Sequence, residues 1–371
     1  MTTRLGVVVL AGPENGGTYQ YTLSTLQALR YTSGFDITLY GDPADPELVK
    51  AGYPIVPFSE NRQRQLIALA ADRLGVKLTD PFAAEDILLA PIYSLALLHT
   101  AKPYAYTLHD LQEKHYPGNF SIWQRAWRHQ IHAQLLRRAR HVICESSYVR
   151  ADIIRYFGID EGRIAVIVAP PQGQFESEMD TQQIEAARER MGLPARFLFY
   201  PAQFWPHKNH MRLLEAFRGV VDEIGDVSLV LTGKKRDEYQ AVMDAAAKLG
   251  LTEKVHHLGY VELHDLQAAY QLASALVMPS LFESVSIPIY EAFQVGTPVI
   301  ASDVVAIPEQ VGDAGLLFNP TSAPSIRDAI LKMLRDPEAA KRLGRNGRAR
   351  MQAMTPERYG QQLQELLQSS R

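Results

Sequence analysis

The chain has 371 residues, 46% of them hydrophobic and 21% charged, and its 38 Lys and Arg residues nearly balance 41 Asp and Glu, for a formal net charge of −3. This composition excludes a disordered or fibrous protein and leaves room for about two domains of roughly 150 residues each. No global positive field exists, so no nucleic-acid partner is expected. Cys144 has no second cysteine to pair with, and the first residues lead into a strand-like run rather than a cleavable signal, which predicts a cytoplasmic protein.

Short apolar runs alternate with helical patterns in the first half of the chain. A helix is predicted at 19–31, after the Gly16-Gly17 pair, and strands at 5–10, 36–40, 86–90, 104–108, 141–144 and 164–168. The strands are continuously apolar, which is typical of parallel strands covered on both faces. The first half is therefore predicted to be a doubly wound α/β sheet.

A second α/β series follows a stretch at 169–181 that contains prolines and a glycine and is predicted to be a linker. A helix from Asn209 has its apolar residues on one stripe, and strands are predicted at 197–200, 227–231, 255–258, 275–278 and 298–301. Ligands of such sheets lie beyond the carboxyl ends of the strands, so the predicted site is a cleft where the two domains face each other.

The predicted domains are residues 1–175 and 176–354. They are followed by an amphipathic helix at 355–371, which has Pro356 at its start and is expected to pack back on the first domain.

The most informative segment follows the predicted strand at 275–278. Glu283 lies in a loop, Pro288 fits the first turn of a helix, and Glu291 lies within that helix. Three backbone amides would then lie at the helix N-terminus, those of Ser284, Val285 and Ser286. Unpaired donors and the helix dipole favour anions there. The spacing also fits a structural alternative, in which Glu283 caps the helix and Glu291 lies on a solvated face.

Two other segments follow predicted strands. Lys208 lies beside the N-terminus of the helix from Asn209, where a cation opposes the helix dipole unless an anion sits between them. The Gly16-Gly17 pair lets the backbone approach a phosphate or sugar, but the Gly-x-Gly-x-x-Gly spacing is absent, which argues against a nicotinamide oxidoreductase. The alternatives are a surface lysine and an ordinary turn.

A histidine follows the predicted strand at 104–108. His109 could hydrogen-bond a sugar hydroxyl or act as an acid or base, and the alternative is a structural histidine. The sequence has no Asp-x-Asp, no cysteine cluster and no His-Glu-x-x-His, so no metal site is predicted.

The stretch at 121–141 contains five arginines and no acidic residue, with Trp123 and Trp127 between them. A basic, aromatic helix of this kind can lie on an anionic membrane surface, and the alternative is a solvated face.

Taken together, these residues resemble the retaining glycosyltransferases of glycosyltransferase family 4, which have the GT-B fold: two Rossmann-like domains facing across a cleft. The strongest match is Glu283, seven residues and Glu291, followed by Gly296-Thr-Pro-Val-Ile. Supporting matches are the Gly16-Gly17 loop, His109-Asp110, residues 147–158 and His207-Lys208-Asn209. The run at 107–117 is similar to bacterial mannosyl- or glucosyltransferases that build surface polysaccharides.

The resemblance implies that a cation and backbone amides hold the donor diphosphate. Lys208 would neutralise it, and phosphate or sugar would be cradled by the Gly16-Gly17 loop and by the amides of Ser284, Val285 and Ser286. Many relatives have arginine five residues before the lysine, where this chain has Gln203. One cation of the family pattern is therefore missing, and His207 would replace it in part. The usual Gly-x-Gly after the first glutamate is Ser-Val-Ser here, which restricts the backbone.

The resemblance also implies contacts to the rest of the donor. Glu291 would accept hydrogen bonds from the ribose, and the backbone at Tyr260-Val261 would meet the base. Glu283 and His109 would contact the transferred sugar near the reacting carbon.

The implied activity is transfer of a hexose from a UDP- or GDP-sugar to a hydroxyl of a glycan or lipid-linked oligosaccharide in polysaccharide biosynthesis. The configuration would be retained, and neither a metal ion nor another cofactor would be needed. A lipid-linked acceptor would bring the protein to the inner membrane surface through residues 121–141. The alternatives are a sugar-nucleotide epimerase or phosphorylase on the same fold, and a non-catalytic glycan-binding relative.

Overall fold

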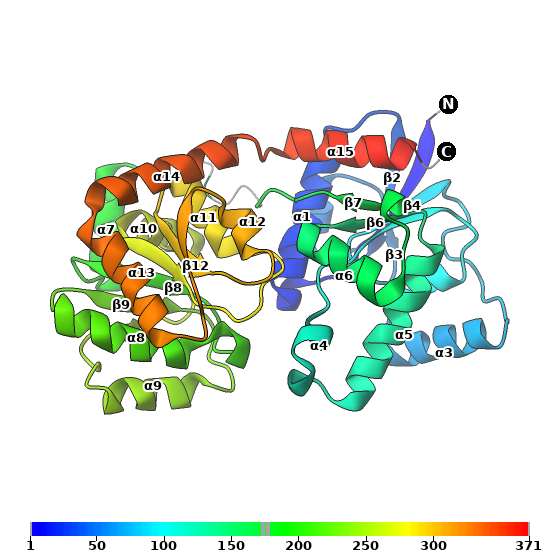
Figure 1. The fold of residues 1–371 in the computed structure, drawn as a ribbon. Helices are drawn as coiled ribbons and strands as arrows, with labels where there is room; N and C mark the ends of the chain where they lie inside the picture. The colour runs from blue at the N-terminus through cyan, green and yellow to red at the C-terminus, as the bar shows by residue number, and fades with distance from the viewer. Residues whose placement is uncertain (1, 172–174, 176–178, 370–371) are drawn as a thin grey trace. The chain divides into compact units, whose positions relative to one another are not determined.

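The computed structural model describes residues 2–171, 175 and 179–369, which form two compact units (Figure 1). Unit 1 comprises Met1–Gln172 and Met354–Arg371, and unit 2 comprises Gly173–Ala353. The predicted linker at 169–181 includes 172–174 and 176–178, so the boundary expected after 175 adjoins residues outside the described part.

Unit 1 is built on a seven-stranded sheet in the order β3-β2-β1-β4-β5-β6-β7. The strands are β1 (Thr3–Val8), β2 (Phe35–Gly41), β3 (Ile55–Pro57), β4 (Ile87–Ala90), β5 (Tyr104–Thr107), β6 (His141–Cys144) and β7 (Ile164–Val166). All neighbouring pairs are parallel, as predicted. β3 is not among the predicted strands; it is a short edge strand with proline on both sides of Ile55 and Val56.

Helices cover both faces of this sheet, because its strands are apolar in both directions. Val8, Leu88 and Tyr106 belong to one hydrophobic cluster, whereas Val7 and Leu89 belong to another. The first cluster includes residues of α3 (Arg62–Arg73), α5 (Ile122–Arg138) and α6 (Ser147–Phe157). The second includes residues of α1 (Gly17–Leu29), α2 (Pro46–Ala51) and α15 (Pro356–Gln368). The short helix α4 (Gln112–His115) precedes α5.

The last helix, α15, packs on α1 within unit 1. Tyr359 is almost fully buried, and its hydroxyl lies 3.0 Å from Oγ1 of Thr25. Gly360 lies against the backbone of Ala28 so closely that a Cβ would come within 2.4 Å of its carbonyl oxygen. The contact therefore requires glycine at position 360.

Unit 2 is built on a six-stranded parallel sheet in the order β10-β9-β8-β11-β12-β13. The strands are β8 (Phe197–Pro201), β9 (Ser228–Thr232), β10 (Val255–His257), β11 (Ala275–Met278), β12 (Val299–Ser302) and β13 (Gly315–Phe318). β13 is not among the predicted strands; it is an edge strand whose first three residues are only partly buried or exposed.

The helices of unit 2 alternate with its strands and continue beyond them. They are α7 (Thr181–Met191), α8 (His210–Glu223), α9 (Tyr239–Lys248), α10 (Leu263–Leu272), α11 (Ile287–Val295), α12 (Ile307–Val311), α13 (Ala323–Arg335) and α14 (Pro337–Gln352). On α8, the apolar stripe seen in the sequence is buried, including Leu213, Phe217 and Val220.

Strand order reverses once in each sheet, between β1 and β4 in unit 1 and between β8 and β11 in unit 2. Ligands of doubly wound sheets bind beyond the carboxyl ends of the strands at such a reversal. The loops that follow β8 and β11 carry Lys208 and Glu283, so these two candidates flank the reversal in unit 2.

Candidate functional site

Lys208 and Glu283 form an ion pair at the carboxyl edge of the unit 2 sheet. The ammonium group of Lys208 donates a hydrogen bond to Oε1 of Glu283. Both side chains are partly shielded from water, at 20% and 12% exposed. The pairing rules out an ordinary surface lysine at 208. The two candidates come from segments that lie 75 residues apart in the chain.

Asn209 links the loops that carry Lys208 and Glu283 through hydrogen bonds of its side chain. Its backbone is left-handed, with φ of 62°, and its side-chain amide donates to the carbonyl oxygens of Pro279 and Pro320, each at 2.9 Å. The amide of Leu281 donates to the carbonyl of His207 at 2.7 Å. The loops after β8 and β11 are therefore joined by direct hydrogen bonds.

A buried tyrosine of β8 also hydrogen-bonds to the loop that carries Lys208. The hydroxyl of Tyr200, on β8, donates to the carbonyl oxygen of Lys208 at 2.8 Å and lies 3.3 Å from Oγ of Ser280. Burial raises the pKa of Tyr200 well above its ordinary value, so the hydroxyl stays a donor. The backbone of Lys208 is thus fixed, and only its side chain is left to respond to a ligand.

The N-terminus of α11 lies directly after Glu283. Pro288 occupies the first turn of α11, as predicted. Among the described residues, no acceptor meets the backbone amides of Ser284 and Val285. The amide of Ser286, by contrast, donates to Oε1 of Gln310 at 2.9 Å, and Nε2 of Gln310 donates back to the carbonyl of Ser286 at 2.6 Å. Within this structure, two of the three predicted anion-binding amides are therefore available.

The side-chain hydroxyl of Ser286, unlike its backbone amide, is unpartnered within the described part of the chain. Its hydroxyl is buried and has no hydrogen-bond partner among the described residues. An unsatisfied buried polar group costs about 1–3 kcal/mol, which a ligand atom could remove. The hydroxyl belongs to the N-cap residue of α11, so within the described structure it is a second kind of unpartnered group at this helix end.

Glu291 lies inside α11 and not on a solvated face. Its side chain accepts a hydrogen bond of 2.6 Å from Tyr270, and the residue is only 7% exposed. Burial raises the pKa of Glu291 to about 7, although the hydrogen bond from Tyr270 opposes the shift. Near neutral pH this carboxyl group can either accept hydrogen bonds or carry a proton.

Gln203 lies in the loop after β8 that also carries Lys208, whereas Tyr260 and Val261 lie in the loop after β10 at the same sheet edge. Oε1 of Gln203 accepts a hydrogen bond from Nε of Arg236, a residue that the sequence analysis passed over. Tyr260 and Val261 follow β10, and Tyr260 is 73% exposed, so its ring is available to a partner.

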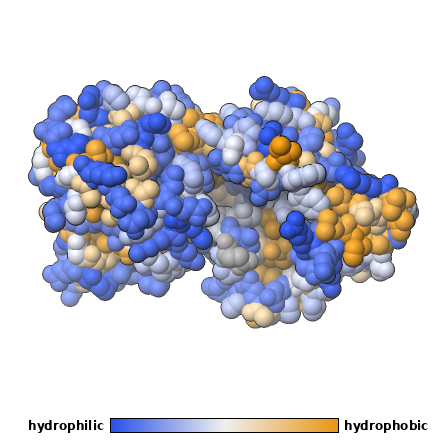
Figure 2. All heavy atoms as spheres, turned by 90° about the horizontal axis from the view of Figure 1, so that it is seen from below, coloured by the Kyte–Doolittle hydropathy of each residue, from blue (hydrophilic) through white to orange (hydrophobic). Residues whose placement is uncertain are grey.

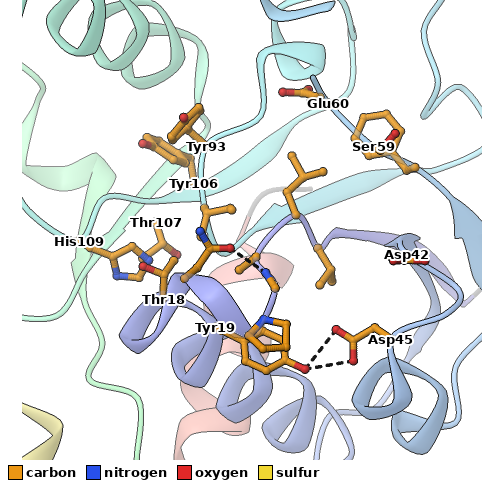
Figure 3. A pocket seen from close by; sticks show the side chains of 18 of the residues that line it. Thr18, Tyr19, Asp42, Asp45, Ser59, Glu60, Tyr93, Tyr106, Thr107 and His109 are labelled. Carbon is orange, nitrogen blue, oxygen red and sulfur yellow. Dashed lines mark hydrogen bonds between the residues drawn. The ribbon is translucent and has the colours of Figure 1, made fainter. Parts of the chain in front are cut away.

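In unit 1, Gly16 is the turn residue that caps the N-terminus of α1, and Gly17 is the first residue of that helix. Gly16 has φ of 57° and ψ of −118°, a conformation that residues with a side chain rarely adopt. A pocket of about 920 Å³ lies next to this turn. Among the described residues, its lining includes Asn15 and Thr18 but neither glycine (Figure 3).

His109 lines this pocket, and both of its ring nitrogens face protein groups. Nδ1 lies 2.9 Å from Oε2 of Glu145, and Nε2 lies 2.9 Å from the carbonyl oxygen of Pro91. Burial lowers the pKa of His109, but the hydrogen bond and charge of Glu145 outweigh it and leave the pKa raised. A carboxylate and a carbonyl are both acceptors, so this arrangement favours the protonated ring. Both nitrogens have protein partners in this arrangement, so a hydrogen bond from His109 to a sugar hydroxyl would replace one of these contacts. The contact with the transferred sugar stays a prediction.

The pocket also has features that the sequence analysis did not single out. Aromatic rings on its wall come from Phe58, Tyr93, Tyr106 and Trp127. Carboxylates come from Asp42, Asp45, Glu47, Glu60 and Asp110. Asp45 accepts hydrogen bonds from the hydroxyl of Tyr19 at 3.0 and 3.1 Å (Figure 3). Aromatic faces beside hydrogen-bond acceptors suit a hydroxyl-rich ligand.

Part of the basic charge at 121–141 is neutralised inside unit 1. Nε of Arg128 donates to Glu113 at 2.9 Å, and Arg138 pairs with Asp72. At the start of α5, in contrast, Ile122 and Trp123 are 77% and 84% exposed. The predicted surface is therefore limited to the first turn of α5 and the remaining arginines.

The described residues contain neither a candidate membrane-spanning helix nor a candidate metal cluster. Among residues 2–171, 175 and 179–369, no helix is long and apolar enough to cross a membrane. Within the same residues, no group of three or more His, Cys, Asp or Glu side chains is placed to hold a metal ion.

Several solved structures share this fold over the whole chain. The *Anabaena* Alr3699/HepE structure in complex with UDP and glucose has a TM-score of 0.78 and 20% identity, covering 99% of this chain and 100% of that one. WaaG, described as a glycosyltransferase involved in lipopolysaccharide biosynthesis, has a TM-score of 0.71 and 16% identity, covering 98% and 99%. Two Rossmann-like parallel sheets with these neighbours define the GT-B fold class.

Both halves of the chain also match family models. Residues 15–168 match the model described as Glycosyltransferase Family 4, and residues 183–350 match the model described as Glycosyl transferases group 1. The chain belongs to the glycosyltransferases of the family 4 type, as the resemblance predicted.

Named relatives include transferases of O-antigen chains. The chain is 24% identical over 340 residues to the O-antigen chain mannosyltransferase RfbU of *Salmonella typhimurium*, covering 89% of this chain and 91% of the relative. It is 28% identical over 202 residues to the O-antigen chain mannosyltransferase B of *Escherichia coli*, covering 54% of this chain and 53% of that protein. The chain thus spans most of the first relative and about half of the second.

Proposed function

We propose that this glycosyltransferase moves a hexose from a UDP- or GDP-linked sugar to a hydroxyl of a glycan or lipid-linked oligosaccharide in polysaccharide biosynthesis. The bond between the anomeric carbon and the diphosphate oxygen breaks, and a bond to the acceptor oxygen forms. The acceptor hydroxyl proton leaves with the nucleoside diphosphate. The names of the O-antigen mannosyltransferase relatives support this class of product.

The observation that carries the proposal is the Lys208–Glu283 pair beside the N-terminus of α11. The donor diphosphate would draw Lys208 away from Glu283. Its oxygens would accept hydrogen bonds from the free amides of Ser284 and Val285 and from the hydroxyl of Ser286. Glu283 would then be free to contact the transferred sugar. Fixed donors of this kind stabilise the negative charge that develops on the leaving diphosphate.

The same donors support transfer without a metal ion, because a lysine and helix amides can supply the charge that a cation supplies elsewhere. We further propose that the configuration at the anomeric carbon is retained, as the family resemblance implies. Glu291 would accept hydrogen bonds from the ribose in its ionised form, and the loop at Tyr260-Val261 would meet the base.

The acceptor would bind in the pocket of unit 1. Its aromatic walls offer flat surfaces to sugar rings, and its carboxylates accept from hydroxyl groups. His109 would support this wall as a charged, internally bonded group, and it would reach a sugar hydroxyl only by giving up its contact with Glu145 or Pro91.

The test is turnover of UDP- and GDP-hexoses with a mixture of oligosaccharide acceptors, with and without EDTA. Release of nucleoside diphosphate and a glycoside of unchanged anomeric configuration, read by NMR, is the expected result. Lys208→Ala should reduce turnover about 100- to 1,000-fold, the usual effect of removing one preorganised donor. Lys248→Ala removes an exposed lysine of α9 and should leave turnover unchanged.

Three results would overturn parts of the proposal. An epimerised or phosphorolysed sugar in the absence of acceptor would indicate one of the enzymes considered as alternatives. Loss of turnover in EDTA would contradict metal independence. Absence of turnover with every donor, in a protein that still binds glycans, would indicate a non-catalytic relative.

A further inference from the structure

The loop after β9 contains three consecutive basic residues, Lys234, Lys235 and Arg236. The last of them, Arg236, contacts the loop that holds Lys208. Nε of Arg236 donates a hydrogen bond of 2.8 Å to Oε1 of Gln203. The guanidinium carbon lies 5.1 Å from the centre of a Trp205 ring. Gln203 and Trp205 belong to the loop after β8, and the amide of Trp205 donates to the carbonyl of Gln203 at 2.9 Å. Arg236 is therefore held on two groups of the Lys208 loop.

A glycine makes this approach possible. Gly233 has φ of 115°, and a Cβ on it would lie 2.7 Å from the carbonyl oxygen of Ala202. The amide of Gly233 donates to the carbonyl of Gly259 at 2.8 Å, and the amide of Glu238 donates to the carbonyl of Phe204 at 3.3 Å. Both ends of the Arg236 loop are thus fastened to neighbouring loops of the same sheet edge.

The groups that hold Arg236 are neutral and leave its charge uncompensated. An amide oxygen and an indole ring orient a guanidinium without cancelling its charge. Among the described residues, Arg236 forms no ion pair, whereas Arg190 and Arg218 of the same unit pair with Asp265 and Asp222. The Nη groups of Arg236 can therefore donate hydrogen bonds to a ligand. The planar guanidinium group has the geometry to donate two parallel hydrogen bonds to phosphate oxygens.

We propose that Arg236 binds the diphosphate of the donor together with Lys208, and that Gln203 is a positioning residue which orients it through Nε. This inference rests on the proposed function. Gln203 occupies the position where the family pattern has an arginine. In this chain, Arg236 in the neighbouring loop would supply that positive charge. The partial replacement of this charge by His207 stays a separate prediction.

The test compares binding of nucleoside diphosphates with that of the matching monophosphates by calorimetry, using UDP and UMP and then GDP and GMP. Arg236→Gln should raise the Kd of the diphosphate about tenfold to a hundredfold, because a hydrogen bond to a charged group is lost, with a smaller effect on the monophosphate. Lys235→Gln is the matched control. The ammonium group of Lys235 packs on another ring, with Nζ 4.5 Å from the centre of the Tyr239 ring. Lys235→Gln therefore removes one neighbouring positive charge without touching the contacts of Arg236, and the diphosphate Kd should stay within about twofold of the wild-type value.

A charge transplant separates binding from a merely structural role. In Gln203→Arg/Arg236→Gln, the guanidinium is moved to the loop after β8, and the diphosphate Kd should return towards the wild-type value. Arg236 is exposed, so the melting temperature without ligand should be unchanged in both variants.

The outcomes distinguish the two proposals. If Arg236→Gln binds the diphosphate as the wild type does while Lys208→Ala does not, the inference is wrong and the proposed function stands. If Arg236→Gln weakens diphosphate and monophosphate equally and Gln203→Arg does not restore binding, Arg236 only shapes the loop and the inference is again overturned. If the wild type binds neither diphosphate, the proposed function fails, and the inference fails with it.

Discussion

Glu291 is a buried carboxyl group whose protonation depends on folding. Its pKa is raised from about 4.5 to about 7 by burial, with Tyr270 opposing the shift. Between these values the folded protein holds the proton more often than the unfolded chain does, so the free energy of unfolding falls as the pH rises from 4.5 to 7. The full cost of the buried charge, on the order of 3 kcal/mol, is reached above pH 7.

Replacing this carboxyl group by an amide should remove that pH dependence. Glu291→Gln can still accept from Tyr270, so we expect a melting temperature close to that of the wild type at pH 5 and above it at pH 8. The same variant should bind the donor more weakly, since an ionised acceptor for the ribose is lost. A difference in melting temperature that is equal at the two pH values would contradict the buried, titrating carboxyl group.

His109 provides a second test at this scale. Glu145 outweighs burial and raises the pKa of His109, so the stability that the pair contributes is present below pH 6.5 and is lost as the pH rises through the folded-state pKa. Glu145→Gln should lower the pKa of His109, measured by NMR titration of the labelled imidazole, because burial then acts with little opposition. A titration that is the same in variant and wild type would mean that Glu145 does not hold the imidazolium.

The sequence identified most of the side chains of the unit 2 site, but not how they pair. Lys208 and Glu283 could each be placed after a strand, and parallel strands bring such loops to one edge. Their direct contact depends on the strand order, which joins β8 to β11 across the reversal. Arg236 could not be predicted, because its place depends on the close approach of Gly233 to Ala202.

At the scale of elements, α5 combines two roles. Towards the pocket it presents Trp127 and Arg128, and at its first turn Ile122 and Trp123 are exposed. A second apolar area lies over α3 and the segment after it, where Leu74 is exposed, and it is visible at the right-hand end of the molecule in Figure 2.

We propose that the first turn of α5 contacts an anionic membrane surface, with the remaining arginines adding charge attraction. The wild type should co-sediment with vesicles that contain anionic lipid at low salt and less so at high salt. Trp123→Ser should reduce this binding, and Val49→Ser, an exposed apolar residue of α2, should not. Binding that falls with Leu74→Ser and not with Trp123→Ser would place the contact on α3, and an absence of binding would end the membrane proposal.

Most central strands were predictable, and the two missed strands lie at sheet edges. A central strand is apolar on both faces, which gives a continuous signal such as that of β11. β3 and β13 are partly exposed edge strands, but β7 and β10 are too and were predicted, so the edge position alone does not account for the two misses. In β3 the apolar run is interrupted after Ile55 and Val56, which lie between Pro54 and Pro57.

At the scale of the whole molecule, two units of one architecture divide the proposed work. Unit 2 holds the cationic and amide donors, and unit 1 holds the pocket with carboxylates and aromatic rings. The sequence predicted two doubly wound sheets, because each half repeats the same alternation of strands and helices. It could not predict the pocket, whose walls come from loops after several strands and from α5.

The role of Lys208 in donor binding is tested most sharply by a thermal melt of the whole protein with UDP- and GDP-sugars and the free diphosphates. The melt is run with and without EDTA, in the wild type and in Lys208→Ala. A ligand at 100 times its Kd adds about 2.7 kcal/mol to the free energy of unfolding, enough for a shift of several degrees. We expect a shift for one nucleotide series that EDTA does not remove and that Lys208→Ala abolishes. A wild type that shifts with none of these ligands, or a shift that survives in Lys208→Ala, would contradict this expectation.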